Sequence, residues 1–174
     1  MSNTPTPHRR VITRKVVDWA AWDWGSAAFN AVATTFVFTT YLTSDGVFTD
    51  KGTAATWLSN GMTIAGLFIA LLAPITGQRA DRRGRGGVWL GWFTGAVVLC
   101  MLAMYFVHPE SVLGPKGALM LGIALLGLGN VFFEFASVNY NAMLNHLGEK
   151  EDRGKISGFG WASGYIGGIV LLLI

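Results

Sequence analysis

Long apolar runs alternate with short polar stretches along the whole chain. The runs cover residues of about 18–42, 57–77, 88–107, 117–144 and 156–174. A helix needs about 20 mostly apolar residues to cross the hydrocarbon core of a bilayer, and each run is near or above that length. No long linker or low-complexity tract separates them. The pattern predicts an all-α membrane protein, a multi-pass helical bundle with five spanning helices in one bundle.

The composition supports a lipid environment. Hydrophobic residues make up 52% of the chain and charged residues only 13%, whereas soluble domains carry about 25% charged residues. The charge that remains is concentrated in the polar stretches between the runs. We therefore expect the lipid bilayer to be the main partner of the protein surface.

The basic residues favour one side of the predicted membrane. If the runs cross in turn, only Lys51 and Lys116 fall on one face, and the rest of the Lys and Arg residues fall on the other: Arg9, Arg10, Arg14, Lys15, Arg79, Arg82, Arg83, Arg85, Lys150, Arg153 and Lys155. Basic loops stay in the cytoplasm. This predicts a cytoplasmic N-terminal segment, residues 1–17, followed by a bundle over residues 18–174 in the inner or plasma membrane. Because the basic residues track these loops, no nucleic-acid partner is expected.

Polar residues inside two runs are candidates for function, because ionisable groups at membrane depth are costly. Asp23 and Asn30 lie seven residues apart in the first run, which places them on one face of a helix. Gly127, Asn130, Glu134, Ser137 and Asn141 recur at three- and four-residue steps in the fourth run. We interpret Asp23, Asn30, Asn130 and Glu134 as a substrate or coupling cavity, in which Glu134 carries a proton or binds a cationic group. The alternative is a structural carboxylate that is hydrogen-bonded between helices.

Other chemistry is not indicated. The chain has no paired-histidine metal spacing, no phosphate-binding Gly-Lys-Ser/Thr loop and no nucleophile elbow. We therefore expect neither an enzyme nor a metal or other cofactor. In the last run, Gly160, Gly164 and Gly168 recur at four-residue steps, a pattern typical of close helix packing in membranes.

The polar stretch after the second run carries a recognisable motif. Residues 77–85 have the sequence Gly-Gln-Arg-Ala-Asp-Arg-Arg-Gly-Arg, and we expect Gly77 to end the second helix. The stretch resembles the G-x-L-A-D-R-x-G-R signature of the major facilitator superfamily, with Arg79 in place of the leucine. It also has the expected position, in an inner loop between the second and third helices. The resemblance implies that this is a gating loop, formed by Gly77, Asp81, Arg82, Gly84 and Arg85.

The resemblance extends to both ends of the chain. Residues 23–30 and 153–168 resemble the vacuole-effluxer-like branch of that superfamily, which is related to autophagy-linked amino-acid exporters. The resemblance implies a twelve-helix fold of which this chain carries the first five helices. It also implies secondary active transport of a small polar solute such as an amino acid, coupled to an ion or proton and working by alternating access.

The last residues, 167–174, are Gly-Gly-Ile-Val-Leu-Leu-Leu-Ile. Because a carboxylate inside hydrocarbon is costly, we expect the chain to be an N-terminal fragment whose partner is the missing C-terminal transmembrane half. The alternative is a small non-enzymatic membrane subunit or assembly protein whose polar stripe binds a partner helix.

Overall fold

The structure is a computed structural model that describes the backbone of residues 11–83 and 86–174, and the side chains of residues 11–76 and 86–174. Every regular element in these ranges is helical. The elements follow in the order α1 (Arg14–Ala27), η1 (Ala28–Phe36), α2 (Phe38–Leu42), α3 (Lys51–Arg83), α4 (Gly86–Met104), α5 (Gly114–Met143), η2 (Leu144–His146) and α6 (Arg153–Leu173). The predicted all-α fold is therefore confirmed.

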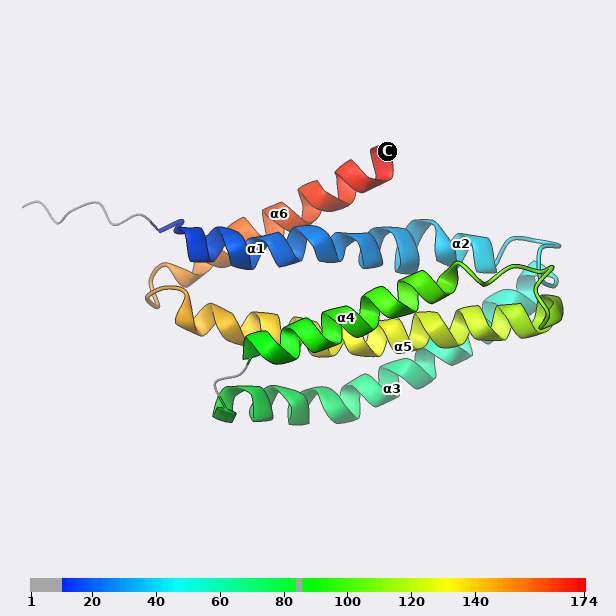
Figure 1. The fold of residues 1–174 in the computed structure, drawn as a ribbon, viewed down its shortest axis with the longest axis horizontal. Helices are drawn as coiled ribbons and strands as arrows, with labels where there is room; N and C mark the ends of the chain where they lie inside the picture. The colour runs from blue at the N-terminus through cyan, green and yellow to red at the C-terminus, as the bar shows by residue number, and fades with distance from the viewer. Residues whose placement is uncertain (1–10, 84–85) are drawn as a thin grey trace, which may run out of the picture.

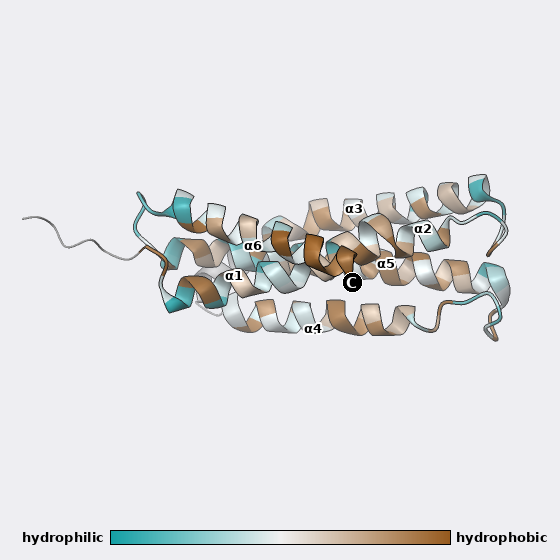
Figure 2. Ribbon diagram, turned by 90° about the horizontal axis from the view of Figure 1, so that it is seen from above, coloured by the Kyte–Doolittle hydropathy of each residue, from teal (hydrophilic) through white to brown (hydrophobic). Residues whose placement is uncertain are grey.

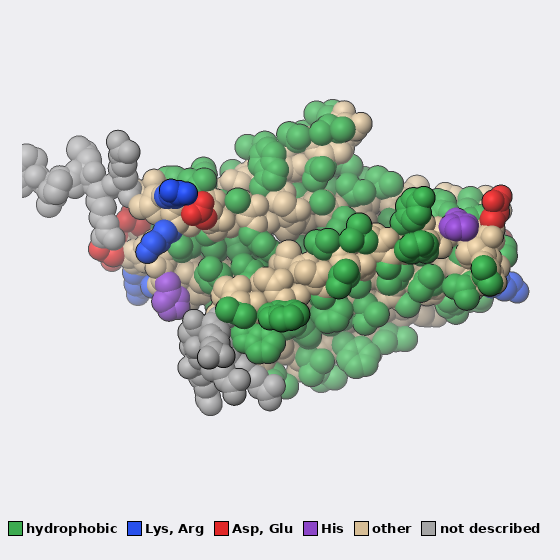
Figure 3. All heavy atoms as spheres, viewed as in Figure 1, with side chains coloured by type: hydrophobic (Ala, Val, Ile, Leu, Met, Phe, Trp, Pro, Cys, Tyr) green, Lys and Arg blue, Asp and Glu red, His purple; other side chains and the backbone are tan. Residues whose placement is uncertain are grey.

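Four of the described helices are long and apolar enough to cross a membrane. They cover Lys51–Thr76, Gly86–Met104, Gly114–His146 and Arg153–Leu173. Charged side chains gather at the two ends of the bundle, and a broad apolar belt lies between them (Figure 3). The ribbon coloured by hydropathy shows the same division, with the hydrophilic residues concentrated toward the ends (Figure 2). The bundle thus has the surface that a bilayer requires.

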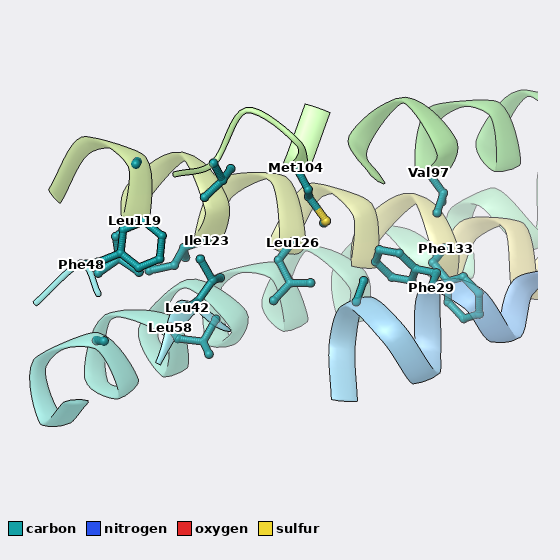
Figure 4. Close-up of a cluster of buried hydrophobic side chains, with 14 residues drawn as sticks. Phe29, Leu42, Phe48, Leu58, Val97, Met104, Leu119, Ile123, Leu126 and Phe133 are labelled. Atoms are coloured by element: carbon teal, nitrogen blue, oxygen red, sulfur yellow. The ribbon is translucent and has the colours of Figure 1, made fainter. Parts of the chain in front are cut away.

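Helix α5 is the centre of the bundle. It packs against α3 and α4, while α6 packs against α1 (Figure 1). The main core lies where α5 meets its neighbours, and its largest fully buried side chains are Phe29, Leu42, Leu119 and Leu126 (Figure 4). A second, smaller core forms near the start of α1 from Val16, Trp19, Ala20, Tyr140 and Ile156. Through these two cores α5 holds the first helix along most of its length.

The first apolar run, predicted as a spanning helix over residues 18–42, is helical but changes its hydrogen-bond pattern along its length. Residues 14–42 form α1, a nine-residue π-helix η1 and the short α2. Threonine hydroxyls accompany the change: Thr34 and Thr35 donate to the Asn30 carbonyl at 2.7 and 2.8 Å, and Thr39 donates to the Thr34 carbonyl at 2.9 Å. Such bonds compete with the regular backbone pattern and bend helices. Hydropathy alone carries no information about this competition.

The prediction that Gly77 ends the second helix is wrong, because α3 continues to Arg83. An apolar run marks where a helix leaves the hydrocarbon, not where it ends, and Gln, Arg and Ala are good helix formers in water. Helix α3 also begins at Lys51, six residues before the predicted span. There the Asp50 carboxylate accepts the Thr53 backbone N–H at 2.9 Å, and the Asp45 carboxylate accepts the Lys51 N–H at 3.1 Å. Both bonds satisfy N–H groups that a helix start leaves open.

Candidate functional site

A cavity of about 620 Å³ lies between the first helix, α5 and α6. Its wall is formed by side chains of α1 and η1, of the second half of α5, and of one face of α6. The lining residues are Trp22, Asp23, Ser26, Ala27, Asn30, Ala31, Thr35, Phe36, Phe133, Ser137, Tyr140, Asn141, Trp161, Gly164, Tyr165, Gly168, Ile169 and Leu172. Its volume is in the range of pockets that hold small molecules.

Asp23 supplies the charge in this cavity. It lies in the second half of α1 and is half-buried. Gly164 of α6 makes room for it: a methyl group at Gly164 would lie 3.2 Å from Cγ of Asp23 and 3.3 Å from Oδ1. Ser26 donates to the backbone carbonyl of Asp23, at 3.0 Å, and not to its carboxylate. Within the part of the chain that the structure describes, no hydrogen bond to the carboxylate itself is found.

The wall next to Asp23 is aromatic. Tyr140 of α5 is only 4% exposed and lies between two indole rings of α1. Its ring centroid lies 4.2 Å from that of Trp19, with the planes 2° apart, and 4.5 Å from that of Trp22. Trp19 Nε1 donates to the Tyr140 carbonyl at 3.0 Å, and Trp22 Nε1 donates to Thr94 Oγ1 at 2.9 Å. These bonds fix the position of α1 relative to α5 and α4.

The hydroxyl of Tyr140 is buried and has no hydrogen-bond partner among the described residues. It lies against Gly160 of α6, where an added methyl group would be 2.9 Å from the oxygen. Gly160 and Gly164 are one helical turn apart, so the Tyr140 hydroxyl and the Asp23 carboxylate meet the same face of α6. A buried hydroxyl without a partner costs about 1–3 kcal/mol. The close packing of α6 at Gly160 covers this hydroxyl, so the cavity is lined by the ring of Tyr140.

The structure brings together two of the four predicted cavity residues. Asp23 and Asn30 both line the cavity, and Asn30 lies in the π-helical segment, where its carbonyl is already occupied by threonine hydroxyls. Asn130 and Glu134 are half-buried on α5 but are not among the lining residues. Ser137 and Asn141, two further members of the same polar stripe, line it in their place.

The aromatic part of the candidate site was not predicted from the sequence. Trp161 and Tyr165 stand on α6 with ring centroids 6.1 Å apart, and Phe133 lies 5.9 Å from Trp22. A signal was present in the four-residue spacing of Trp161 and Tyr165, which puts both rings on one face of a helix. In a membrane helix, however, aromatic residues also face lipid, so spacing alone does not select them.

The predicted gating loop lies largely outside what the structure describes. Gly84 and Arg85 are outside the described residues, as are the side chains of Gly77, Asp81 and Arg82. The backbone of the last three belongs to α3. Their assignment to gating therefore stays a prediction.

Gly160, Gly164 and Gly168 all face α1. Gly168 lies at ordinary contact distance from Ala27 and Ala31, where a methyl group would be 3.7 and 3.8 Å from their Cβ atoms. Gly167, which the four-residue pattern missed, makes the closest approach. A methyl group there would lie 2.6 Å from the Trp24 carbonyl oxygen. The contact between α1 and α6 thus brings backbone close to backbone.

Comparison with known proteins identifies the family. The family model described as Major Facilitator Superfamily matches residues 3–172. The search of curated proteins and the search of solved structures gave no match. Because the family model covers nearly the whole chain, the chain belongs to the major facilitator superfamily. It is therefore a multi-pass membrane protein of a transporter family, and members of that family are in general not enzymes.

Proposed function

We propose that this member of the major facilitator superfamily is a secondary active transporter that moves a small polar solute by alternating access. One observation carries the proposal. Asp23 and Asn30 of the first helix and Ser137 and Asn141 of α5 meet in a single cavity, inside a bundle with an apolar outer belt. Polar groups at membrane depth must face protein or water. In a transporter they face the solute.

The two acidic residues have different roles in this proposal. Asp23 contacts the solute, because it lines the cavity. Glu134 carries the coupled proton, because it is half-buried in α5 beside the cavity wall and not in it. An ionisable group inside a spanning helix supports such a role. The resemblance of residues 23–30 and 153–168 to the vacuole-effluxer-like branch supports amino acids as the first solutes to test.

We infer the orientation from the described basic residues. One end of the bundle contains the start of α1 and the connection from α5 to α6, with Arg14, Lys15, Lys150, Arg153 and Lys155 (Figure 1). The other end contains Lys51 and Lys116. The positive-inside rule then puts the N-terminus on the cytoplasmic side of a plasma or inner membrane. Glu110→Cys in a Cys100→Ser background should react with an impermeant maleimide added outside the cell; labelling only after permeabilisation would reverse the orientation.

The function is tested in vesicles. The intact protein is reconstituted in liposomes with an imposed proton gradient, and uptake of a mixture of radiolabelled amino acids is measured, with labelled glucose as the comparison. Asp23→Asn should reduce uptake at least about tenfold, since a hydrogen bond to a charged group contributes about 1.5–3 kcal/mol. Glu134→Gln should remove the dependence on the gradient and keep solute exchange without a gradient.

The control is Glu110→Gln, which removes an exposed carboxylate outside the spanning helices. It should transport like the unmodified protein. Uptake that is the same in the Asp23→Asn variant would contradict the role of the cavity. A variant that changes only assembly with a partner protein would support the alternative of a membrane subunit.

A further inference from the structure

The cavity has a negative charge and no described positive charge to balance it. Among the described residues that line it, Asp23 is the one acidic residue and none is Lys, Arg or His. Its carboxylate accepts no hydrogen bond from the described part of the chain. A carboxylate that is half-removed from water and lacks a partner is destabilising, because it loses hydration without gaining a counter-ion. A ligand with a positive charge offsets this cost, and an anionic ligand increases it.

The surface around Asp23 is built from aromatic rings. Trp22, Phe133 and Tyr140 form one wall, with ring centroids 4.5 Å apart for Trp22 and Tyr140 and 5.9 Å apart for Trp22 and Phe133. Trp161 and Tyr165 stand on α6 and also line the cavity. The faces of aromatic rings attract cations, Trp most strongly, and such rings are the usual surface that binds alkylated ammonium groups.

Helix α6 places the carboxylate among these rings. Asp23 packs against Gly164, which directly precedes Tyr165 in the sequence. One turn earlier, Gly160 directly precedes Trp161. The Tyr140 hydroxyl packs against Gly160. Positions four residues apart on a helix are separated by about 5–6 Å. Within two turns, α6 therefore carries the rings of Trp161 and Tyr165 and packs against the Asp23 carboxylate and the Tyr140 hydroxyl.

We propose that this cavity binds a small organic cation with an alkylated ammonium group. Asp23 is the counter-ion, and the rings of Trp22 and Trp161 contact the alkyl groups around the nitrogen. The proposal rests on the proposed function, since it names the solute class of the same cavity. Among the small polar solutes of the proposed function, it distinguishes cations from zwitterions. An amino acid, which the resemblance suggests as a first solute to test, is a zwitterion whose carboxylate finds no basic side chain among the described lining residues, so this proposal ranks cations ahead of it.

The test compares three probes of nearly equal size on the purified intact protein. Choline is a cation, 3,3-dimethylbutan-1-ol is its neutral carbon counterpart, and glycine betaine is the corresponding zwitterion. Binding is followed by titration calorimetry in detergent. Choline should bind at least about tenfold more tightly than the neutral alcohol, which loses both the ionic contact and the cation–π contact. It should also bind more tightly than glycine betaine, whose added carboxylate is repelled by Asp23 and has no basic partner among the described lining residues. Equal binding of choline and its neutral counterpart would overturn the proposal, as would tighter binding of glycine betaine.

Two variants test the assignment of residues. Asp23→Asn should abolish the preference for choline over the neutral alcohol, and Glu110→Gln should leave it unchanged. Trp161 is 63% exposed, so its replacement does not disturb the core. Trp161→Leu should weaken choline binding about three- to tenfold and should not weaken binding of the alcohol, whereas Trp161→Phe, which keeps an aromatic face, should restore most of the loss. If Asp23→Asn does not fold, this second pair decides the question.

The outcomes separate this inference from the transport function. Uptake of amino acids or of another solute in vesicles, with no preference for choline in the binding assay, would overturn the cation site and leave transport standing. Choline binding that depends on Asp23, with no transport of any probe, would support the site and contradict the proposed function.

Discussion

Two helix contacts in this bundle are built in opposite ways. Helix α5 meets α3 and α4 through large apolar side chains, of which Leu119 and Leu126 are almost fully buried, and Ile123 packs into the space left by Gly61. Helix α6 meets α1 through glycines: Gly160 and Gly164 leave room for the side chains of Trp19 and Asp23, and Gly167 approaches the Trp24 backbone. The first contact fills its volume. The second brings the helices close at a few points and leaves the polar cavity beside them. The tightly filled contact therefore serves as a scaffold, and the site lies at the glycine contact.

The largest expected effect comes from opening the filled contact. Leu126→Ala removes a side chain that is 1% exposed and belongs to the main core. We expect a loss of about 2–3 kcal/mol, in the lower part of the range for buried leucines, because lipid already supplies an apolar surrounding for the unpacked helix. The measurement is reversible unfolding in mixed detergent micelles, followed by circular dichroism.

Leu128→Ala is the matched control for this change. It lies on the same helix and is 51% exposed, so its effect should stay within about 0.5 kcal/mol. Choline binding should survive in both variants at temperatures where they are folded. Equal destabilisation by the two changes would contradict the central position of α5.

The next effect concerns the glycine contact. Gly167→Ala places a methyl group 2.6 Å from the Trp24 carbonyl oxygen and 3.1 Å from its Cα, and backbone atoms cannot move aside without moving α1. We expect a loss of about 1–2 kcal/mol, typical of overpacking, together with weaker ligand binding because the cavity changes shape. Unfolding and calorimetry on the same preparation measure both.

The neighbouring Gly168→Ala is the control. Its methyl group would make ordinary contacts at 3.7 and 3.8 Å with Ala27 and Ala31, and alanine is the better helix former by up to about 1 kcal/mol. This variant should be as stable as the unmodified protein or more stable. If both alanine variants behave alike, the close approach at Gly167 does not limit the packing of α6.

A smaller loss of stability is expected at Trp19, where α1 packs against α5. Trp19→Phe removes the hydrogen bond from Nε1 to the Tyr140 carbonyl, 3.0 Å long, and keeps an aromatic ring against Tyr140. The expected loss is about 1 kcal/mol, measured by the same unfolding assay. Trp24→Phe replaces an indole that is 43% exposed and should change stability by less than about 0.5 kcal/mol. A larger loss for Trp24→Phe than for Trp19→Phe would contradict this account.

The smallest effect lies at the exposed start of α3. The Thr53 backbone N–H bonds to the Asp50 carboxylate and, with the Thr53 side chain, lowers the pKa of that carboxyl below its ordinary value of 3.8. The stabilisation that Asp50 contributes is thus complete above pH 3.8 and disappears as the pH falls through the lower pKa of the folded protein. Asp50→Asn keeps a capping side chain but cannot titrate.

The measurement is the melting temperature of both proteins as a function of pH. The unmodified protein should lose a small advantage over Asp50→Asn when the pH falls below 3.8. Glu110→Gln controls for the general effect of removing an exposed carboxylate. A constant difference between the unmodified protein and Asp50→Asn over this pH range would show that the charge of Asp50 does not stabilise α3.

The fold was predictable to the extent that it follows from lipid solubility. Apolar length predicted the spanning helices over residues 57–77, 88–107, 117–144 and 156–174, and each lies within or close to an observed helix. The ends of the helices were not predictable from the same signal. Helix α3 begins with a hydrogen bond to the Asp50 carboxylate and continues to Arg83, and a plot of hydropathy marks neither position as an end.

The site was predictable only in part, for a geometric reason. Asp23 and Asn30 could be found because ionisable and amide groups are rare at membrane depth. On α5 the polar stripe was visible, but which of its edges faces α1 and α6 depends on how the helix is rotated in the bundle. Ser137 and Asn141 face the cavity and Glu134 does not line it. Sequence periodicity defines a stripe and leaves that rotation open.

The π-helical stretch from Ala28 to Phe36 links the hydrogen-bond pattern of the first helix to the direction in which its side chains point. A π-helix closes each hydrogen bond over one more residue than an α-helix does, and an α-helix turns by about 100° for each residue. When a backbone hydrogen bond in this stretch changes from the π pattern to the α pattern, the residues that follow it therefore rotate about the helix axis relative to Asp23. Asn30, Thr35 and Phe36 line the cavity from inside this stretch. The hydrogen-bond pattern of this stretch, in which the hydroxyls of Thr34, Thr35 and Thr39 take part, therefore determines how the lining residues beyond Asp23 are turned toward the cavity.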